Sequence, residues 1–169
     1  MKFEKVSLEI WEKYYPEKYV PNKGHSTQTW EDIKLPQRAT SGSMGYDLYS
    51  PFAFTLEVGL IIKLPLGIKF NPGAYGYHHQ IGLLIYPRSG LGSKGLNLLN
   101  QTGVIDPDYY GNPSTGGLIF AALVNNGRST IHIEKGQAIL QGILTPFYVT
   151  EDDQPRTAKR MGGFGSTDE

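Results

Sequence analysis

The chain of 169 residues contains no cysteine. This absence excludes disulfide bonds, thiolate metal sites and cysteine nucleophiles. An excess of charge of one sign is also missing, because 16 Lys and Arg residues balance 16 Asp and Glu residues. No overall field therefore draws the chain to nucleic acid or to a membrane surface, and an anionic ligand must be held by a local site.

The sequence also lacks long hydrophobic runs. No segment approaches the roughly 18 apolar residues that span a bilayer. The charged N-terminal stretch, MKFEKVSLEIWEKYYPEKY, does not contain the apolar core of a signal peptide. We therefore expect an intracellular protein with no membrane or nucleic-acid partner, located in the cytoplasm, or in the nucleus where the context is eukaryotic or viral.

Turn-forming residues are abundant, with 21 glycines and 11 prolines. Between the turns lie short segments rich in β-branched and aromatic residues, and some of them alternate apolar with polar residues. We expect strands at residues 46–49, 52–57, 60–64, 67–70, 81–86, 118–124, 130–133 and 138–145. Many short strands at this spacing predict an all-β jelly-roll or barrel, rather than a parallel α/β sheet.

The chain divides into three parts by composition. Residues 1–30 are rich in Lys, Glu, Tyr and Pro, and they form an N-terminal extension of unknown role with one short helix expected at residues 7–15. Residues 31–150 form the β-domain. Residues 151–169 are polar and contain glycine, which predicts a flexible C-terminal arm.

A first candidate for ligand binding is the segment YPRSGLGSK at residues 86–94. Pro87 and Gly90 end a strand abruptly and leave Arg88 and Ser89 between them. A guanidinium can bind phosphate through two hydrogen bonds, and glycine lets ligand oxygens approach backbone N–H groups. The alternative is an ordinary solvated turn with an arginine at the surface.

A second candidate is the segment NQTGVIDPDYYG at residues 100–111. Asn100 and Gly103 indicate a tight hairpin whose amide and backbone groups can pair with the edge of a nucleobase. Val104 and Ile105 fix Asp106 at the rim of the core, where a carboxylate can act as a general base. The alternative is a structural hairpin with an Asp-Pro turn.

The third candidate is the C-terminal segment RTAKRMGGFGST at residues 156–167. Its three glycines make it flexible, and Phe164 lies between cations and hydroxyl groups. Such a segment can close over a nucleotide, with the aromatic ring on the base. Alone it could equally be a disordered tail. Together, the three candidates offer partners for a base, a sugar and a polyphosphate.

Five segments occur in the order that is typical of one enzyme family. They are ATSGSMGYDL (39–48), PRSGL (87–91), GVIDPDYYG (103–111), GQAILQ (136–141) and RMGGFGST (160–167). With these five motifs the chain resembles the trimeric dUTPases over roughly residues 35–167. Each motif alone is weak evidence, whereas five in this order are highly specific.

The resemblance implies a jelly-roll-like dUTPase fold of the β-clip type, a homotrimer with exchange of C-terminal arms, and active sites built from several subunits. It implies hydrolysis of dUTP to dUMP and pyrophosphate by attack of water on the α-phosphorus. Asp106 would activate that water. Mg²⁺ would be held mainly by the substrate phosphates, with Asp47 contacting it through water.

The same resemblance assigns the groups that bind the substrate. Arg88, Ser89 and Gly90 would hold the phosphates, with help from Gln141. Uracil would be recognised by Asn100 and by the backbone from Gly103 through Val104 to Ile105, and Tyr109 would lie beneath the deoxyribose. Residues of the arm would complete the site, with Phe164 stacked on uracil and Gly165, Ser166 and Arg160 around the terminal phosphates.

Three departures from the family pattern stand out. Arg160 and Met161 directly precede Gly-Gly-Phe, so Lys159 is an alternative for the cation of the fifth motif, although the fork of Arg160 suits phosphate better. Residues 74–81 and 112–117 look like inserted surface loops.

Two other functions stay open: a dCTP deaminase-like enzyme, or a dUTP-binding regulatory module whose extension or loops contact an unidentified protein partner.

Overall fold

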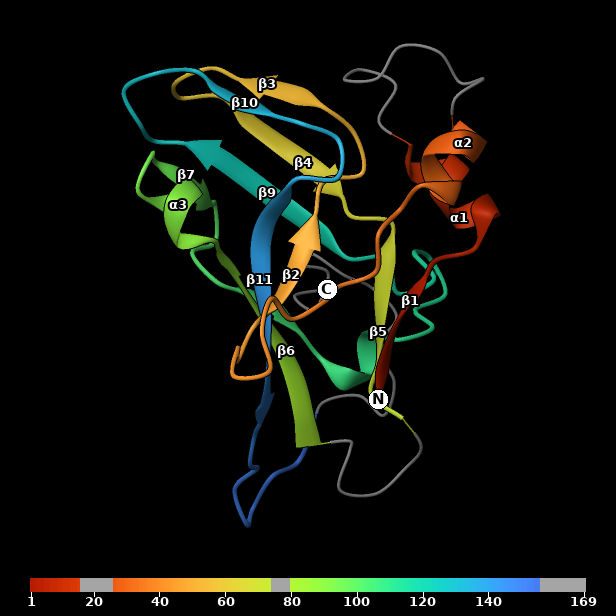
Figure 1. The fold of residues 1–169 in the computed structure, drawn as a ribbon. Coiled ribbons are helices and arrows are strands. Elements are labelled where there is room, and N and C mark those ends of the chain that lie inside the picture. The colour runs from red at the N-terminus through yellow and green to blue at the C-terminus, as the bar shows by residue number, and fades with distance from the viewer. Residues whose placement is uncertain (16–25, 74–79, 156–169) are drawn as a thin grey trace.

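The computed structural model describes residues 1–15, 26–73 and 80–155. In these ranges the chain folds mostly into short antiparallel strands (Figure 1). The all-β prediction is therefore confirmed. No helix in the described ranges has the length and apolar character that crossing a bilayer requires.

The largest sheet has four strands in the order β2-β11-β6-β8. Its strands are β2 (Tyr46–Tyr49), β11 (Ala138–Pro146), β6 (Ile81–Pro87) and β8 (Gly103–Ile105). The long strand β11 lies between β2 and β6, so Gln141 pairs with Asp47 on one side and with Tyr86 on the other. This register brings three motifs that are far apart in sequence to one place.

The remaining strands form smaller sheets across the core. A three-stranded sheet has the order β4-β9-β7, and two pairs join β3 to β10 and β1 to β5. The bounds are β4 (Ile61–Pro65), β9 (Phe120–Asn125), β7 (Leu96–Leu98), β3 (Phe54–Leu56), β10 (Ile131–Ile133), β1 (Lys2–Lys5) and β5 (Ile68–Asn71). Alternate residues of these strands, such as Ile131 and Ile133, are buried in a common hydrophobic core.

All eight expected strands are present, with ends shifted by at most two residues. Three strands were not expected, namely β1, β7 and β8. The predicted hairpin around Asn100 and Gly103 is wrong: β7 pairs with β9 and β8 pairs with β6, so the turn between them passes from one sheet to another. The turn residues themselves form the tight bend that the sequence indicates, with Gln101 at a positive φ of 64°.

The expected N-terminal helix is confirmed as α1 (Leu8–Tyr14), which begins after Ser7. The Ser7 hydroxyl accepts a hydrogen bond from the backbone N–H of Ile10 at 3.3 Å, as an N-cap does. A second helix, α2 (Ser26–Glu31), packs beside it (Figure 1). Trp11 of α1 is fully buried, so this face of the helix contributes to the core rather than to the surface.

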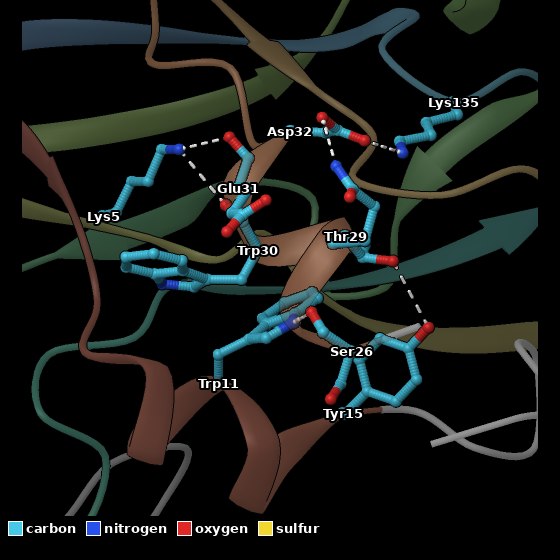
Figure 2. Close-up of polar contacts among 10 residues, drawn as sticks. Lys5, Trp11, Tyr15, Ser26, Thr29, Trp30, Glu31, Asp32 and Lys135 are labelled. Atoms are coloured by element: carbon cyan, nitrogen blue, oxygen red, sulfur yellow. Dashed lines mark hydrogen bonds and ion pairs between the residues drawn. The ribbon is translucent and has the colours of Figure 1, made fainter. Parts of the chain in front are cut away.

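Hydrogen bonds join these two helices to each other and to neighbouring parts of the chain (Figure 2). The indole N–H of Trp11 donates to the carbonyl of Ser26 at 2.9 Å, and Lys5 donates to the carbonyls of Trp30 and Glu31. Asp32 forms an ion pair with Lys135, which lowers the pKa of the Asp32 carboxyl through their hydrogen bond. Together with the pairing of β1 with β5, these contacts hold the described part of the N-terminal extension on the β-domain.

Glu4 on β1 is the centre of a polar cluster. Its carboxylate accepts hydrogen bonds from the Asn71 amide and the Tyr110 hydroxyl, both at 3.0 Å, and lies 3.1 Å from the ammonium of Lys2. These partners, the Asn71 hydrogen bond first, lower the pKa of Glu4 from 4.5 to about 2. Burial, followed by the hydrogen bond to Glu4, raises the pKa of Tyr110.

This pKa shift predicts a pH-dependent stability. Because the folded-state pKa is depressed, the charged Glu4 stabilises the fold above pH 4.5, and this contribution is lost as the pH falls toward about 2. Its side chain is 23% exposed, so solvent weakens the effect. We expect Glu4→Gln to lower the free energy of unfolding by about 1–2 kcal/mol at pH 7.

Denaturant unfolding at one fixed protein concentration measures this difference. The difference in the free energy of unfolding between Glu4→Gln and the wild type should disappear as the pH falls from 4.5 to 2. Glu12→Gln, at an exposed position of α1, is the control and should change little at any pH. A gap at Glu4 that stays constant down to pH 2 would contradict the expectation.

Candidate active site

A pocket of about 270 Å³ lies where the turn after β7 enters β8. Most of its walls come from β8, from the turn before it and from the short 3-10 helix η3 (Pro107–Tyr109) that follows. Its lining comprises Ile85, Leu98, Asn100, Thr102, Gly103, Val104, Ile105, Asp106, Tyr109, Phe120 and Ala122. All six site residues that were predicted from the second candidate segment therefore line one cavity.

This cavity forms where the backbone crosses from one sheet to another. β7 belongs with β9, and β8 belongs with β6, so the turn between them spans the space between the two sheets. Gly103 opens β8 opposite Ile85, and a Cβ atom at this glycine would lie 3.1 Å from the Cβ atom of Ile85. A larger residue would push the strands apart, so glycine permits the close pairing that shapes the pocket wall.

Asp106 is held at the pocket rim by the structure that follows it. Pro107 starts η3, and the backbone N–H of Tyr109 donates to the carbonyl of Asp106 at 3.1 Å. Tyr109 is buried, and its hydroxyl donates to the carbonyl of Leu118 at 2.9 Å. The half-buried Asp106 carboxyl thus sits between a strand end and an anchored aromatic side chain.

Arg88 and Asp47 form a second group of predicted residues. β6 ends at Pro87, and Arg88 caps the one-turn helix α3 (Ser89–Gly92), in which Ser89 and Gly90 are exposed. The Arg88 Nε atom lies 3.1 Å from Oδ1 of Asp47, and the two side chains are 43% and 17% exposed. This ion pair orients the guanidinium while leaving part of it open to a ligand.

Gln141 and Gly90 complete this second group. The Gln141 amide donates to the carbonyl of Pro87 at 3.4 Å, beside the arginine. A Cβ atom at Gly90 would meet nothing within 4 Å, so the space above its backbone is open. The group presents a guanidinium, an amide and an uncovered backbone, which together suit an oxyanion.

The two groups lie at opposite ends of β6. Leu83 pairs with Ile105, so Asp106 falls opposite Gly82, six positions before Arg88. Six residues of extended strand span about 20 Å. Within one chain, the described structure therefore keeps Asp106 and Arg88 too far apart to meet at one point.

The described residues contain no group of three or more His, Cys, Asp or Glu side chains that could hold a metal ion by themselves. The predicted residues of the fifth motif, Lys159, Arg160, Phe164, Gly165 and Ser166, lie outside the described residues. Residues 74–79 of the first predicted insertion also lie outside them.

The second predicted insertion, residues 112–117, is not a free surface loop. Asn112 is buried, and its side-chain oxygen accepts hydrogen bonds from the backbone N–H groups of Ser114 and Thr115. The Ser114 carbonyl in turn contacts α1. The loop therefore packs against the N-terminal helix.

Sequence reasoning did not single out several pocket residues, among them Thr102, Phe120 and Ala122. Phe120 and Ala122 are two positions apart on β9 and so share one face of the sheet. That spacing was visible in the sequence. The sequence does not reveal that β9 pairs with β7, and this pairing turns the shared face toward the pocket.

Comparison with known proteins decides the family. The family model for dUTPase matches residues 31–168, which is most of the chain. The chain belongs to the dUTPase family. Its resemblance in the five motifs is thereby confirmed, and the matched range contains both groups of candidate site residues.

Individual dUTPases agree with this assignment. The deoxyuridine 5'-triphosphate nucleotidohydrolase of Lactococcus lactis is 39% identical over 137 residues, covering 80% of this chain and 88% of that protein. The cowpox virus protein of the same name is 36% identical, covering 79% and 85%. The crystal structure of the dUTPase from Streptococcus mutans superposes with a TM-score of 0.66 at 30% identity, covering 89% of this chain and 99% of that one.

Phage dUTPases share the fold at lower sequence identity. A mutant dUTPase from phage phi11 of S. aureus has a TM-score of 0.58 and 20% identity, covering 76% of this chain and 93% of that one. That structure is described as revealing how a structural Mg(II) ion is coordinated. This likeness confirms the β architecture of the chain.

Proposed function

We propose that this protein hydrolyses dUTP to dUMP and pyrophosphate by attack of water on the α-phosphorus. The observation that carries the proposal is a pocket with a carboxylate at its rim, lined by Asn100, Gly103, Ile105, Asp106 and Tyr109, in a chain of the dUTPase family. These groups offer hydrogen bonds for a base, an aromatic surface for a sugar, and a base for water.

The pocket takes the deoxyuridine part of the substrate. Its volume of about 270 Å³ is at the small end for ligand sites, so the triphosphate extends beyond it. The Asn100 amide and the exposed backbone from Gly103 to Ile105 pair with the uracil edge. Tyr109 lies under the deoxyribose and leaves no space for a 2'-hydroxyl, which disfavours UTP.

Asp106 acts as the general base. A carboxylate at the pocket rim can orient a water molecule and accept its proton as the oxygen attacks the α-phosphorus. Such a positioned base contributes about 10²–10⁴-fold to a rate. The bond between the α-phosphorus and its bridging oxygen breaks, and pyrophosphate leaves with that oxygen.

Arg88, Ser89, Gly90 and Gln141 hold the phosphates, and they come from a neighbouring subunit. The separation of about 20 Å along β6 prevents Arg88 and Asp106 of one chain from meeting on one α-phosphate. A ring of identical subunits solves this, because each site then combines different surfaces of two chains. We therefore propose a homotrimer with three shared sites.

Mg²⁺ fits the residues that are present. The ion keeps several waters and is bound through one or two carboxylates together with substrate phosphates. Asp47, beside Arg88, offers a carboxylate that can accept hydrogen bonds from such waters. When bound, Mg²⁺ would neutralise phosphate charge and so ease the approach of water. Asp47 would contact the waters of the ion, while the phosphates hold it directly.

The C-terminal arm completes the proposal. Phe164 would stack on the uracil ring, and Arg160, Gly165 and Ser166 would meet the terminal phosphates when the arm of a neighbouring subunit closes. Lys159 is the alternative cation. We place the enzyme inside the cell, in the compartment where deoxynucleotides are used.

Pyrophosphate release from purified protein tests the function. With Mg²⁺ present, we expect release from dUTP to exceed release from dCTP, dTTP and UTP by at least about 100-fold in kcat/KM, because the pocket reads the base through hydrogen bonds. Chelation of the metal should greatly reduce the rate. Comparable rates on all four nucleotides would refute the assignment, and ammonia release from dCTP would indicate a deaminase instead.

A further inference from the structure

The N-terminal segment (residues 1–15) contacts the pocket segment (residues 106–118) at two places. At the first, the Tyr110 hydroxyl donates a hydrogen bond to the Glu4 carboxylate at 3.0 Å. Glu4 is itself fixed, because β1 pairs it with Lys69 of β5, whose ammonium lies 3.6 Å from the same carboxylate. Tyr110 directly follows Tyr109, so this contact holds the pocket segment from one side.

The second contact comes from α1. The Tyr14 hydroxyl donates to the carbonyl of Ser114 at 2.9 Å, and the Lys13 ammonium donates to the same oxygen at 3.1 Å. The ring of Tyr14 meets the ring of Phe120 edge-on, with centroids 5.3 Å apart. Phe120 lines the pocket, so α1 supports both the pocket segment and a pocket wall.

A further hydrogen bond joins the residue after Ser114 to the pocket residue Tyr109. The hydroxyl of the next residue, Thr115, donates to the Tyr109 hydroxyl at 3.1 Å. The following Gly116 lies against α1, where a Cβ atom would come within 3.0 Å of the Ile10 side chain. The loop therefore contacts both the helix and Tyr109.

The pocket segment needs such outside support. Its own backbone hydrogen bonds are local: Tyr109 bonds to Asp106, Asn112 to Tyr109, and Leu118 to Thr115. Turns of this 3-10 kind are short and weakly held, so tertiary contacts set where the segment lies. The family model matches from residue 31, so the N-terminal side of both contacts lies outside the matched range.

We propose that Tyr14 and Tyr110 are positioning residues for the reaction, and that the N-terminal segment is the support that keeps the pocket closed to a 2'-hydroxyl. The inference rests on the proposed function, since Tyr109 is taken to lie against the deoxyribose. Loss of either tyrosine hydroxyl loosens the pocket segment. Tyr109 and Asp106 then lose their alignment with the sugar and the attacking water.

The test uses the full chain and four variants: Tyr14→Phe, Tyr110→Phe, their combination and Tyr15→Phe. Tyr15→Phe is the matched control, because it removes the same group one residue away, where the hydroxyl contacts Thr29 of α2 instead of the pocket segment. Steady-state rates on dUTP and UTP are measured with Mg²⁺, well below the melting temperature of every variant.

Each of Tyr14→Phe and Tyr110→Phe should lower kcat/KM for dUTP by about threefold to tenfold, and the pair by more. The preference for dUTP over UTP should fall as well, because the barrier to the 2'-hydroxyl relaxes. A merely structural role would lower stability without changing this preference. Tyr15→Phe should keep both quantities within about twofold of the wild type.

Amide hydrogen exchange gives a second readout that does not depend on activity. Exchange within residues 106–118 should quicken in Tyr14→Phe and Tyr110→Phe but not in Tyr15→Phe. If both variants keep the wild-type preference and exchange, the positioning role is overturned. If the wild-type protein does not hydrolyse dUTP, the proposed function fails, and exchange alone still decides whether these tyrosines hold the segment.

Discussion

Asp106→Asn will abolish dUTP hydrolysis while leaving dUTP binding close to that of the wild type. The amide has almost the same shape, so the pocket that contains it keeps its lining. It cannot accept a proton from water at neutral pH, and loss of a positioned base costs about 10²–10⁴-fold in kcat. Single-turnover hydrolysis and calorimetric titration with dUTP measure the two quantities.

Asp108→Asn is the matched control for this experiment. Asp108 lies two residues further along, at an exposed position of η3, and it is not part of the pocket lining. We expect this variant to stay within about threefold of the wild-type rate. An Asp106→Asn enzyme with near-normal kcat would remove Asp106 from its role as the base, while the pocket could still bind the nucleotide.

Two inactive variants will restore activity when their chains are mixed. Arg88→Ala lacks the guanidinium that binds phosphate, and Asp106→Asn lacks the base, so each alone has little activity. If a site takes Asp106 from one chain and Arg88 from another, some sites in mixed trimers contain both intact residues. With equal amounts of the two chains, half of the sites receive an intact Asp106, and half of those also receive an intact Arg88. About a quarter of the sites are therefore complete.

The measurement is dUTP hydrolysis after the two variants are unfolded together and refolded. Recovery toward about a quarter of wild-type activity is the expected result. The control replaces the Arg88→Ala chain by one that carries both substitutions, so that no intact Asp106 is present and nothing is recovered. Absence of recovery in the first mixture, with mixed trimers present, would show that each chain supplies both residues to its own site.

The sequence predicted those parts of the fold that a local pattern encodes. Tyr46–Tyr49 was expected and found at the same bounds, as a short run of aromatic and apolar residues in which Leu48 is buried. β7 and β8 were missed, because the sequence around them is typical of turns and their partners, β9 and β6, are distant in the chain. Strand pairing of this kind is a tertiary property.

The candidate site divides in the same way. Asp106 and Asn100 were identified together because they lie in one segment that also shapes the pocket. The ion pair between Arg88 and Asp47 could not be predicted from the sequence, because it depends on the register of β11 with both β2 and β6. The role of Tyr14 was equally hidden, because its partner Ser114 is 100 residues away.

The N-terminal segment was set apart by its many charges, yet its apolar residues face the core. Trp11 is fully buried and Tyr15 nearly so, while Glu9, Glu12 and Lys13 of the same helix point outward. The overall composition averages the two faces of the helix, so it does not reveal that one face is apolar and the other is charged. The helix itself was expected from the sequence, whereas its buried face was not.

Both tryptophans of the protein lie in its first thirty residues, at positions 11 and 30. Each indole N–H donates to a backbone carbonyl, Trp11 to Ser26 and Trp30 to Val6. Intrinsic fluorescence therefore reports on this corner of the molecule and hardly on the sheets. A detachment of the N-terminus that precedes global unfolding becomes visible as an early shift in emission, without any introduced label.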